Sequence, residues 1–100
     1  MKAKPVELRL LPVDNKRLAN LCGALDENLR QIETALDITI ARRGERFAVR
    51  GEPRQAAHGA RLIERFYADA ERPLSLDDIQ LGLVEFARLP AAGRKAVVEA

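Results

Sequence analysis

The chain has 100 residues, with 47% hydrophobic and 32% charged side chains and a formal net charge of +2. These values predict one soluble globular domain, and they exclude both a disordered chain and a membrane-embedded one. The charge is also too near neutral to predict nucleic-acid binding from the total alone.

Alternating apolar residues predict a first strand over residues 6–10, which Pro12 ends. Asp14 then has the type and place of an N-cap residue for a short helix over residues 15–22. Gly23 follows this helix, at a place where a residue without a Cβ adopts a positive φ at little cost. The apolar positions of the strand are Val6, Leu8 and Leu10.

A second helix is predicted to begin at Asp26, whose carboxylate can cap it, and to end at Leu36. The apolar period then changes to that of a strand over residues 37–42, and a turn at residues 43–45 leads to a third strand that ends at Gly51. These two strands are expected to form an antiparallel hairpin. The inward stripe of the helix is predicted to be Leu25, Leu29, Ile32 and Leu36.

Pro53 suits the first turn of a long third helix, within which Gly59 is expected to permit a close approach to the sheet. After a break at Pro73, Ser75 and Asp78 have the spacing of a capping box for a fourth helix. The predicted inward residues of the third helix are Ala56, Ala60, Leu62, Ile63, Phe66, Tyr67 and Ala70. The fourth helix has one apolar stripe of Leu76, Ile79, Leu83 and Phe86, and a second of Leu81 and Val84.

This order predicts an α+β fold, with strand, helix, helix, strand, strand and helix arranged around a three-stranded antiparallel sheet and an additional C-terminal helix. Residues 5–89 are assigned to this domain. Residues 90–100, which contain a proline and a glycine, are assigned to a linker.

With a glycine turn between its paired helices, the predicted order resembles a KH domain. It resembles more closely the amino-terminal, KH-like domain of the PhoH-like ATPase family, over about residues 7–84. The segments that carry the resemblance are ELRLLPVDNKRLANLCGALDENLRQIE, DITIARRGERFAVRGEP and LIERFY.

The resemblance implies a non-catalytic accessory domain of a larger ATP-binding protein that acts in RNA metabolism. A phosphate-binding loop needs G-x-x-x-x-G-K-[ST], and none of the six glycines begins one. No catalysis is therefore expected of this sequence, and ATP and Mg²⁺ are expected only for an ATPase domain outside it. The resemblance further implies that ATPase domain and an endoribonuclease as partners.

A KH domain clamps single-stranded nucleic acid between a G-x-x-G turn and a neighbouring strand. The corresponding turn here ends in Asp26 instead of the second glycine, and its carboxylate is expected to occupy the backbone amides and repel phosphate. The nearby cations predict weak, sequence-independent contacts with single-stranded RNA, although a solvated hairpin explains the arginine run equally well. The RNA-binding candidates are Lys16, Arg17, Gly23, Arg30, Arg42, Arg43 and Arg46.

The alternative hypothesis is a protein-interaction or oligomerisation module. A small domain cannot easily bury a helix on both sides, so Leu81 and Val84 are candidates for contact with a second copy, the ATPase domain or the endoribonuclease. A helix-turn-helix DNA reader is less favoured, because its recognition helix would be acidic. An independent enzyme is less favoured because the sequence lacks a catalytic or metal-ligand constellation.

Cys22 is the only cysteine, so an internal disulfide is excluded and a reducing compartment is expected. It is predicted to be a buried apolar residue, and His58 is predicted to be a surface residue. The N-terminus lacks the pattern of a signal peptide, and no segment approaches the roughly 20 apolar residues of a membrane span. The chain is therefore expected to be cytoplasmic, without a membrane partner.

Overall fold

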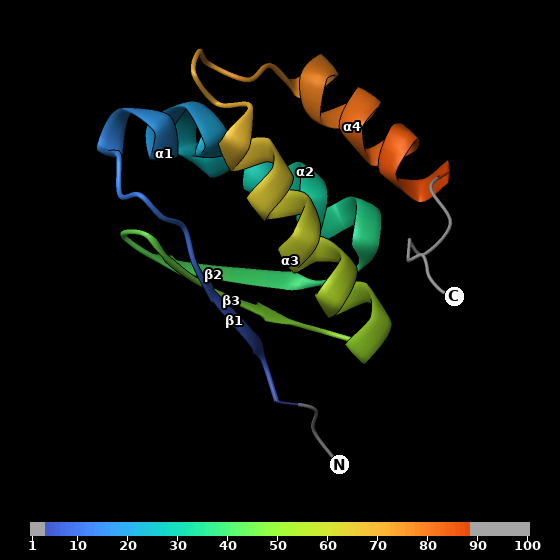
Figure 1. Cartoon of the computed structure of the whole chain (residues 1–100). Helices are drawn as coiled ribbons and strands as arrows, with labels where there is room; N and C mark the ends of the chain where they lie inside the picture. Colours follow the sequence, from blue (N-terminus) through green and yellow to red (C-terminus); the bar gives the residue numbers. More distant parts are fainter. Residues whose placement is uncertain (1–3, 89–100) are drawn as a thin grey trace, which may run out of the picture.

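The structure, a computed structural model, describes residues 4–88, and the side chains of residues 4–85. A three-stranded antiparallel sheet is covered on one face by helices, as the α+β prediction requires (Figure 1). The elements are β1 (Val6–Arg9), α1 (Asn15–Cys22), the short 3₁₀ helix η1 (Ala24–Asp26), α2 (Glu27–Leu36), β2 (Thr39–Arg43), β3 (Arg46–Arg50), α3 (Pro53–Ala68) and α4 (Leu76–Arg88). The predicted linker, residues 90–100, lies outside the described residues.

The sheet has the strand order β1-β3-β2, and both pairings are antiparallel. A two-residue turn joins β2 to β3, and Gly44 takes a positive φ of 61° there, as the tight turns of hairpins require. Phe47 and Val49 of β3 are 2% and 0% exposed and face the helices. Because side chains alternate along a strand, their neighbours on β3 face the other side of the sheet, which no helix of the described chain covers (Figure 1).

The predicted cap of the first helix is confirmed. The Asp14 carboxylate accepts hydrogen bonds from the backbone N–H groups of Lys16 and Arg17 at 3.0 and 3.1 Å. Gly23 ends α1 with φ 77° and ψ 177°, a combination that essentially only glycine adopts. The chain can therefore turn sharply from α1 into η1 and α2.

The predicted inward face of α3 is also confirmed, since its six predicted residues within the helix are buried. Ala70 is buried as well, but it lies in the loop after α3. Gly59 lies where α3 crosses the sheet, and a Cβ at this position would lie 2.5 Å from Cδ1 of Ile38. The close approach expected at Gly59 is thus present. The buried Cys22 likewise agrees with its predicted place in the apolar core.

The capping box of α4 forms as predicted. The Ser75 N–H donates to Oδ2 of Asp78 at 2.9 Å, and the Asp78 N–H donates to Oγ of Ser75 at 3.0 Å. The hydrogen bond from the Ser75 N–H, with a smaller contribution from the Ser75 side chain, lowers the pKa of the Asp78 carboxyl below its ordinary value, because it favours the charged form. Ile79 and Leu83 are buried at the contact of α4 with α2 and α3, whereas the side chain of Phe86 lies outside the described set.

Two buried asparagines hold the loop between α3 and α4 against the first two helices. Nδ2 of Asn20 donates to the carbonyl of Ala70 at 2.9 Å. Nδ2 of Asn28 donates to the carbonyls of Leu21 and Leu74 at 3.0 and 2.9 Å, and Asn28 is 0% exposed. These side chains donate to three carbonyls, whereas Oδ1 of Asn28 is buried without a hydrogen-bond partner among the described residues.

Four details of the predictions are wrong. Leu25 and Leu76 were placed on inward stripes but are 84% and 44% exposed. Leu25 lies in η1 with a left-handed backbone, so it is not in register with the stripe of α2. Asp26 is also left-handed and makes no side-chain cap. His58 is half-buried, and this burial lowers the pKa of its imidazole.

Candidate nucleic-acid interface

The α1–α2 turn and the adjacent edge of β2 form one surface, here called the turn-side surface. It comprises residues 23–26, Arg30 and Arg42. Leu25 and Asp26 take φ values of 53° and 58°, a backbone region that costs non-glycine residues roughly 1–2 kcal/mol each. Such strain is often found at functional sites, which makes this turn a candidate for one.

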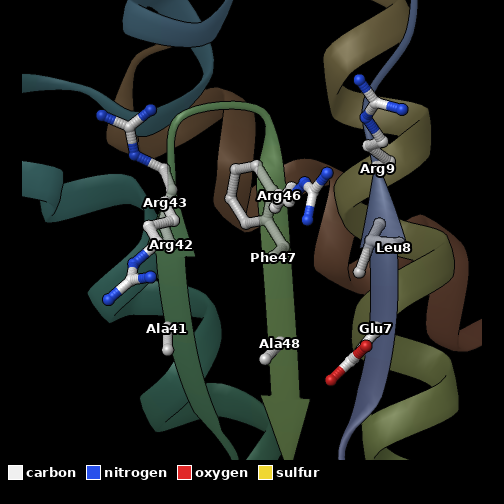
Figure 2. Close-up of a pocket in the computed structure, with 9 residues that line it drawn as sticks. All are labelled: Glu7, Leu8, Arg9, Ala41, Arg42, Arg43, Arg46, Phe47 and Ala48. Atoms are coloured by element: carbon white, nitrogen blue, oxygen red, sulfur yellow. The ribbon is translucent and has the colours of Figure 1, made fainter.

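Arg42 belongs to this surface because of its register. It pairs with the buried Phe47, so its side chain leaves β2 on the helix-facing side. Its Nη1 donates to the carbonyl of Gly44 at 3.1 Å, so the guanidinium lies at the edge of the sheet near the hairpin turn (Figure 2). Burial raises the pKa of the Cys22 thiol, and Arg42 partly opposes this effect. Arg42 therefore lies near the C-terminal end of α1, where the turn begins.

Arg30 approaches the same edge from α2. Oε2 of Glu33 accepts a hydrogen bond of 2.7 Å from the N–H of Ile40, which fixes α2 beside β2. Arg30 lies one helical turn before Glu33 on α2, and Arg42 lies two residues after Ile40 on β2. Because α2 and β2 run in opposite directions, both steps lead the same way from the contact. The two exposed arginines thus extend from this contact toward the hairpin end of β2.

The structure corrects the expected role of Asp26. Its carboxylate makes no cap hydrogen bond, because the left-handed backbone turns it away from the geometry of an N-cap. The backbone N–H of Asp26 instead donates to the carbonyl of Gly23 at 3.2 Å. The carboxylate therefore does not occupy the amides that begin α2, although its negative charge stays at the turn.

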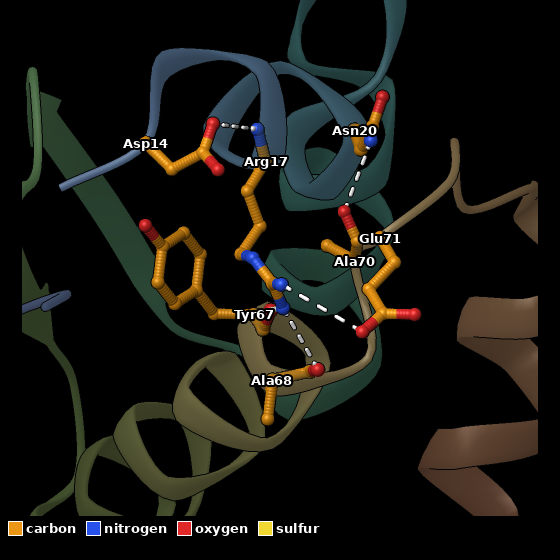
Figure 3. A network of polar contacts seen from close by, with 7 residues as sticks. All are labelled: Asp14, Arg17, Asn20, Tyr67, Ala68, Ala70 and Glu71. Atoms are coloured by element: carbon orange, nitrogen blue, oxygen red, sulfur yellow. Dashed lines mark hydrogen bonds and ion pairs between the residues drawn. The ribbon is translucent and has the colours of Figure 1, made fainter. Parts of the chain in front are cut away.

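Arg17 is a structural residue, not part of this surface. Its Nη1 donates to the carbonyls of Tyr67 and Ala68 at 3.1 and 2.9 Å, where α3 ends (Figure 3). Its guanidinium lies 5.7 Å from the Tyr67 ring centroid, and Nη2 lies 3.9 Å from Oε2 of Glu71. A cation that satisfies the last carbonyls of a helix also complements the helix dipole, so Arg17 is committed to stability.

Lys16 is exposed in the first turn of α1, roughly 10 Å along the helix from Gly23. It is therefore peripheral to the turn-side surface. Arg43 and Arg46, in contrast, pair with each other across β2 and β3 and face the open side of the sheet. The hairpin arginines thus belong to two opposite faces.

The sequence interpretation missed Arg9, which joins Arg43 and Arg46 on the open side because it pairs with Arg46 (Figure 2). Nε of Arg9 lies 3.2 Å from Oε2 of Glu45, in the hairpin turn. The hydrogen bond to Arg9 contributes to a lowered pKa of the Glu45 carboxyl, after a larger contribution from its own backbone N–H. The alternation of residues 6–10 places Arg9 on the polar face of its strand, but it does not indicate that β1 pairs with β3.

The chain matches no protein-family model, and no solved structure resembles it with statistical significance.

The described residues offer little chemistry beyond charge. Phe47, Phe66 and Tyr67, the aromatic residues among the described side chains, are 2–5% exposed and cannot stack on bases. No group of three or more potential metal ligands occurs within residues 4–88, and no helix in that range is long and apolar enough to cross a membrane. The surface can offer cations and backbone N–H groups, which favour phosphate over bases.

Proposed function

We propose that the chain is a non-catalytic accessory domain with KH-like topology that contributes to RNA interaction, as the resemblance to the amino-terminal domain of PhoH-like ATPases implies. The observation that supports this proposal best is that Arg42 lies beside the sharp turn between α1 and α2. A single strand crossing there would meet a cation on the strand side and a glycine-opened backbone on the helix side.

The element order and the strand order β1-β3-β2 support the same proposal, since they place the paired helices and the hairpin edge next to each other. Asp26 limits the strength of binding because it adds a negative charge to the turn. The contacts would be to the phosphate backbone, and they would be weak, salt-sensitive and largely independent of sequence.

Replacing Arg42 with alanine should weaken binding of a short single-stranded RNA by about three- to fivefold, as expected for the loss of one exposed ionic contact. Fluorescence anisotropy with an end-labelled oligouridylate at low salt measures this change. Arg54→Ala is the matched control: it removes the same charge from the first turn of α3, which lies at the other end of the sheet from the hairpin turn (Figure 1). Equal losses of RNA affinity in both variants would show that binding depends only on total charge, and this result would contradict the proposal.

A second candidate function is a protein-interaction or oligomerisation module. It is favoured by the exposure of Leu81 and Val84, which are 59% and 45% exposed on one side of α4. An ATPase domain or an endoribonuclease are the partners that the resemblance implies.

If α4 mediates self-association, the wild-type chain should sediment as a dimer at high concentration, and the Leu81→Ser/Val84→Ser variant as a monomer. The substitution should leave the unfolding free energy within about 0.5 kcal/mol, because both side chains are already largely in solvent. Analytical ultracentrifugation decides between the two states. A wild-type chain that stays monomeric at every concentration would remove self-association from the proposal.

A further inference from the structure

The open face of the sheet carries an unusual row of like charges. Arg9, Arg46 and Arg43 come from β1, β3 and β2, and the strand register places them directly across from one another. Strands are about 4.8 Å apart, so the three side chains leave the sheet within about 10 Å. The row is visible at the hairpin end of the sheet, with the helices on the far side (Figure 2).

This row is unfavourable for folding by itself. Like charges directly opposite each other on neighbouring strands destabilise a sheet, and Arg46 has an arginine on both sides. Of the three, Arg9 has an ion pair within the described part of the chain, with Glu45, which also lies in the field of Arg46. Glu45 is therefore the carboxylate that pairs with this row, and Arg43 and Arg46 have no ion-pair partner among residues 4–85.

Small side chains make the sheet accessible beside the row. Ala41 and Ala48 pair across β2 and β3 in the next position, and they line a depression of about 490 Å³ together with the three arginines. Arg42 borders this depression from the edge of β2, and Glu7 lies on its β1 side. A ligand can thus approach the backbone closely between the arginines and the alanines.

The charges also continue along the sheet. Arg50 lies four residues after Arg46 on β3 and faces the same side, about 13 Å farther along the strand. Glu7 opposes Ala48 from β1, so the less acidic path runs on the β2 side, over Ala41. Cations spaced along an open path suit an extended polyanion better than a single small anion.

We propose that the open face of the sheet is a second nucleic-acid-binding surface, on which Arg9, Arg46 and Arg43 contact phosphates of a single-stranded backbone. This surface lies on the side of the sheet opposite the turn-side surface, and it does not depend on that surface. The contacts are electrostatic and do not read the bases, because the exposed groups of the row are guanidinium groups and the floor is alanine.

The test compares two faces of one hairpin in the full chain. Affinity for an end-labelled oligouridylate of about ten nucleotides is measured between about 50 mM and about 200 mM salt. The Arg43→Gln/Arg46→Gln variant should bind at least about fivefold more weakly, and the slope of log affinity against log salt should fall by about 1.4, or about 0.7 for each lost phosphate contact. The same variant should unfold at no lower urea concentration than wild type, because it removes a like-charge pair.

Arg42→Ala tests the turn-side surface, although Arg42 also borders the depression, and Arg54→Gln measures the effect of removing one positive charge away from both surfaces. If the double variant keeps its affinity within about twofold and its salt slope, the open-face proposal is overturned, whatever Arg42→Ala does. If Arg42→Ala has no effect while the double variant loses affinity, the turn-side proposal fails and the open-face proposal stands.

Inorganic phosphate is added at constant ionic strength as a further probe. Full displacement of the oligonucleotide at millimolar phosphate, with affinity independent of oligonucleotide length, would show a site for a free anion and overturn the proposal.

Discussion

Asn28→Asp is expected to destabilise the domain by about 3–5 kcal/mol at pH 7, a large fraction of the stability of a domain of this size. The native side chain is 0% exposed and donates from Nδ2 to the carbonyls of Leu21 and Leu74. Aspartate would lose both donors and place a buried negative charge against two carbonyl oxygens. The α3–α4 loop would lose its attachment to α1 and α2.

The loss should depend on pH in a defined direction. Burial raises the pKa of the introduced carboxyl in the folded state above its unfolded value of about 4. The charge penalty is therefore absent below about pH 4, grows as the pH rises through and above that value, and is complete above the folded-state pKa. Urea denaturation of both proteins, followed by circular dichroism at pH 7 and near pH 4.5, should show the difference between them shrinking at the lower pH.

Asn15→Asp is the matched control, since it makes the same chemical change at an exposed position. Asn15 is the first residue of α1, where a carboxylate interacts favourably with the positive end of the helix. The unfolding free energy of the Asn15→Asp variant should be unchanged or slightly higher than that of the wild type. A loss below about 1 kcal/mol for Asn28→Asp at pH 7 would be incompatible with an amide buried between two carbonyls.

Gly23→Ala should lower the unfolding free energy by about 2–4 kcal/mol, because it combines backbone strain with a steric contact. The φ of 77° and ψ of 177° lie in a region that residues with a Cβ avoid. An added Cβ would also lie 3.0 Å from Cγ and Nδ2 of the buried Asn28. The amide cannot move away without giving up its hydrogen bonds to Leu21 and Leu74.

Gly44→Ala separates the two effects. Gly44 also has a positive φ, of 61°, but nothing lies within 4 Å of an added Cβ there. It should therefore lose only the conformational contribution, about 1 kcal/mol. Urea denaturation of both variants measures the difference. Equal losses would show that neither the extreme ψ of Gly23 nor its packing against Asn28 adds to the cost of a positive φ.

Most elements of this fold could be predicted from the sequence because their signals are local. Asp14, Gly23, Pro53 and the Ser75–Asp78 pair mark the ends of helices through contacts with residues at most four positions away, and all are found at these ends. The inward face of α3 likewise follows from its period alone. Leu25 shows the limit of this reasoning: it fits the stripe of α2 in spacing, but its left-handed backbone places it in solvent.

The candidate site was less predictable, because charged side chains carry no local signal of the face to which they belong. Arg42 and Arg43 are adjacent in sequence and lie on opposite faces, and their pairing with Phe47 and Arg46 shows which residues share the face of each. Arg17 resembles the other cations in sequence, yet it binds carbonyls about 50 positions away. No local pattern in the sequence predicts that Asn20 and Asn28 are buried.

The sequence by itself determined the order of the helices and strands and most of their ends, since short-range hydrogen bonds and apolar periods fix these. It did not predict η1, and it placed the start of β2 at Asp37 instead of Thr39. The tertiary structure alone decided that β3 lies between β1 and β2. That arrangement brings Arg9 and Arg43 to either side of Arg46, because strand pairing joins residues that are far apart in the chain. The concentration of positive charge on the open face is thus a consequence of strand register.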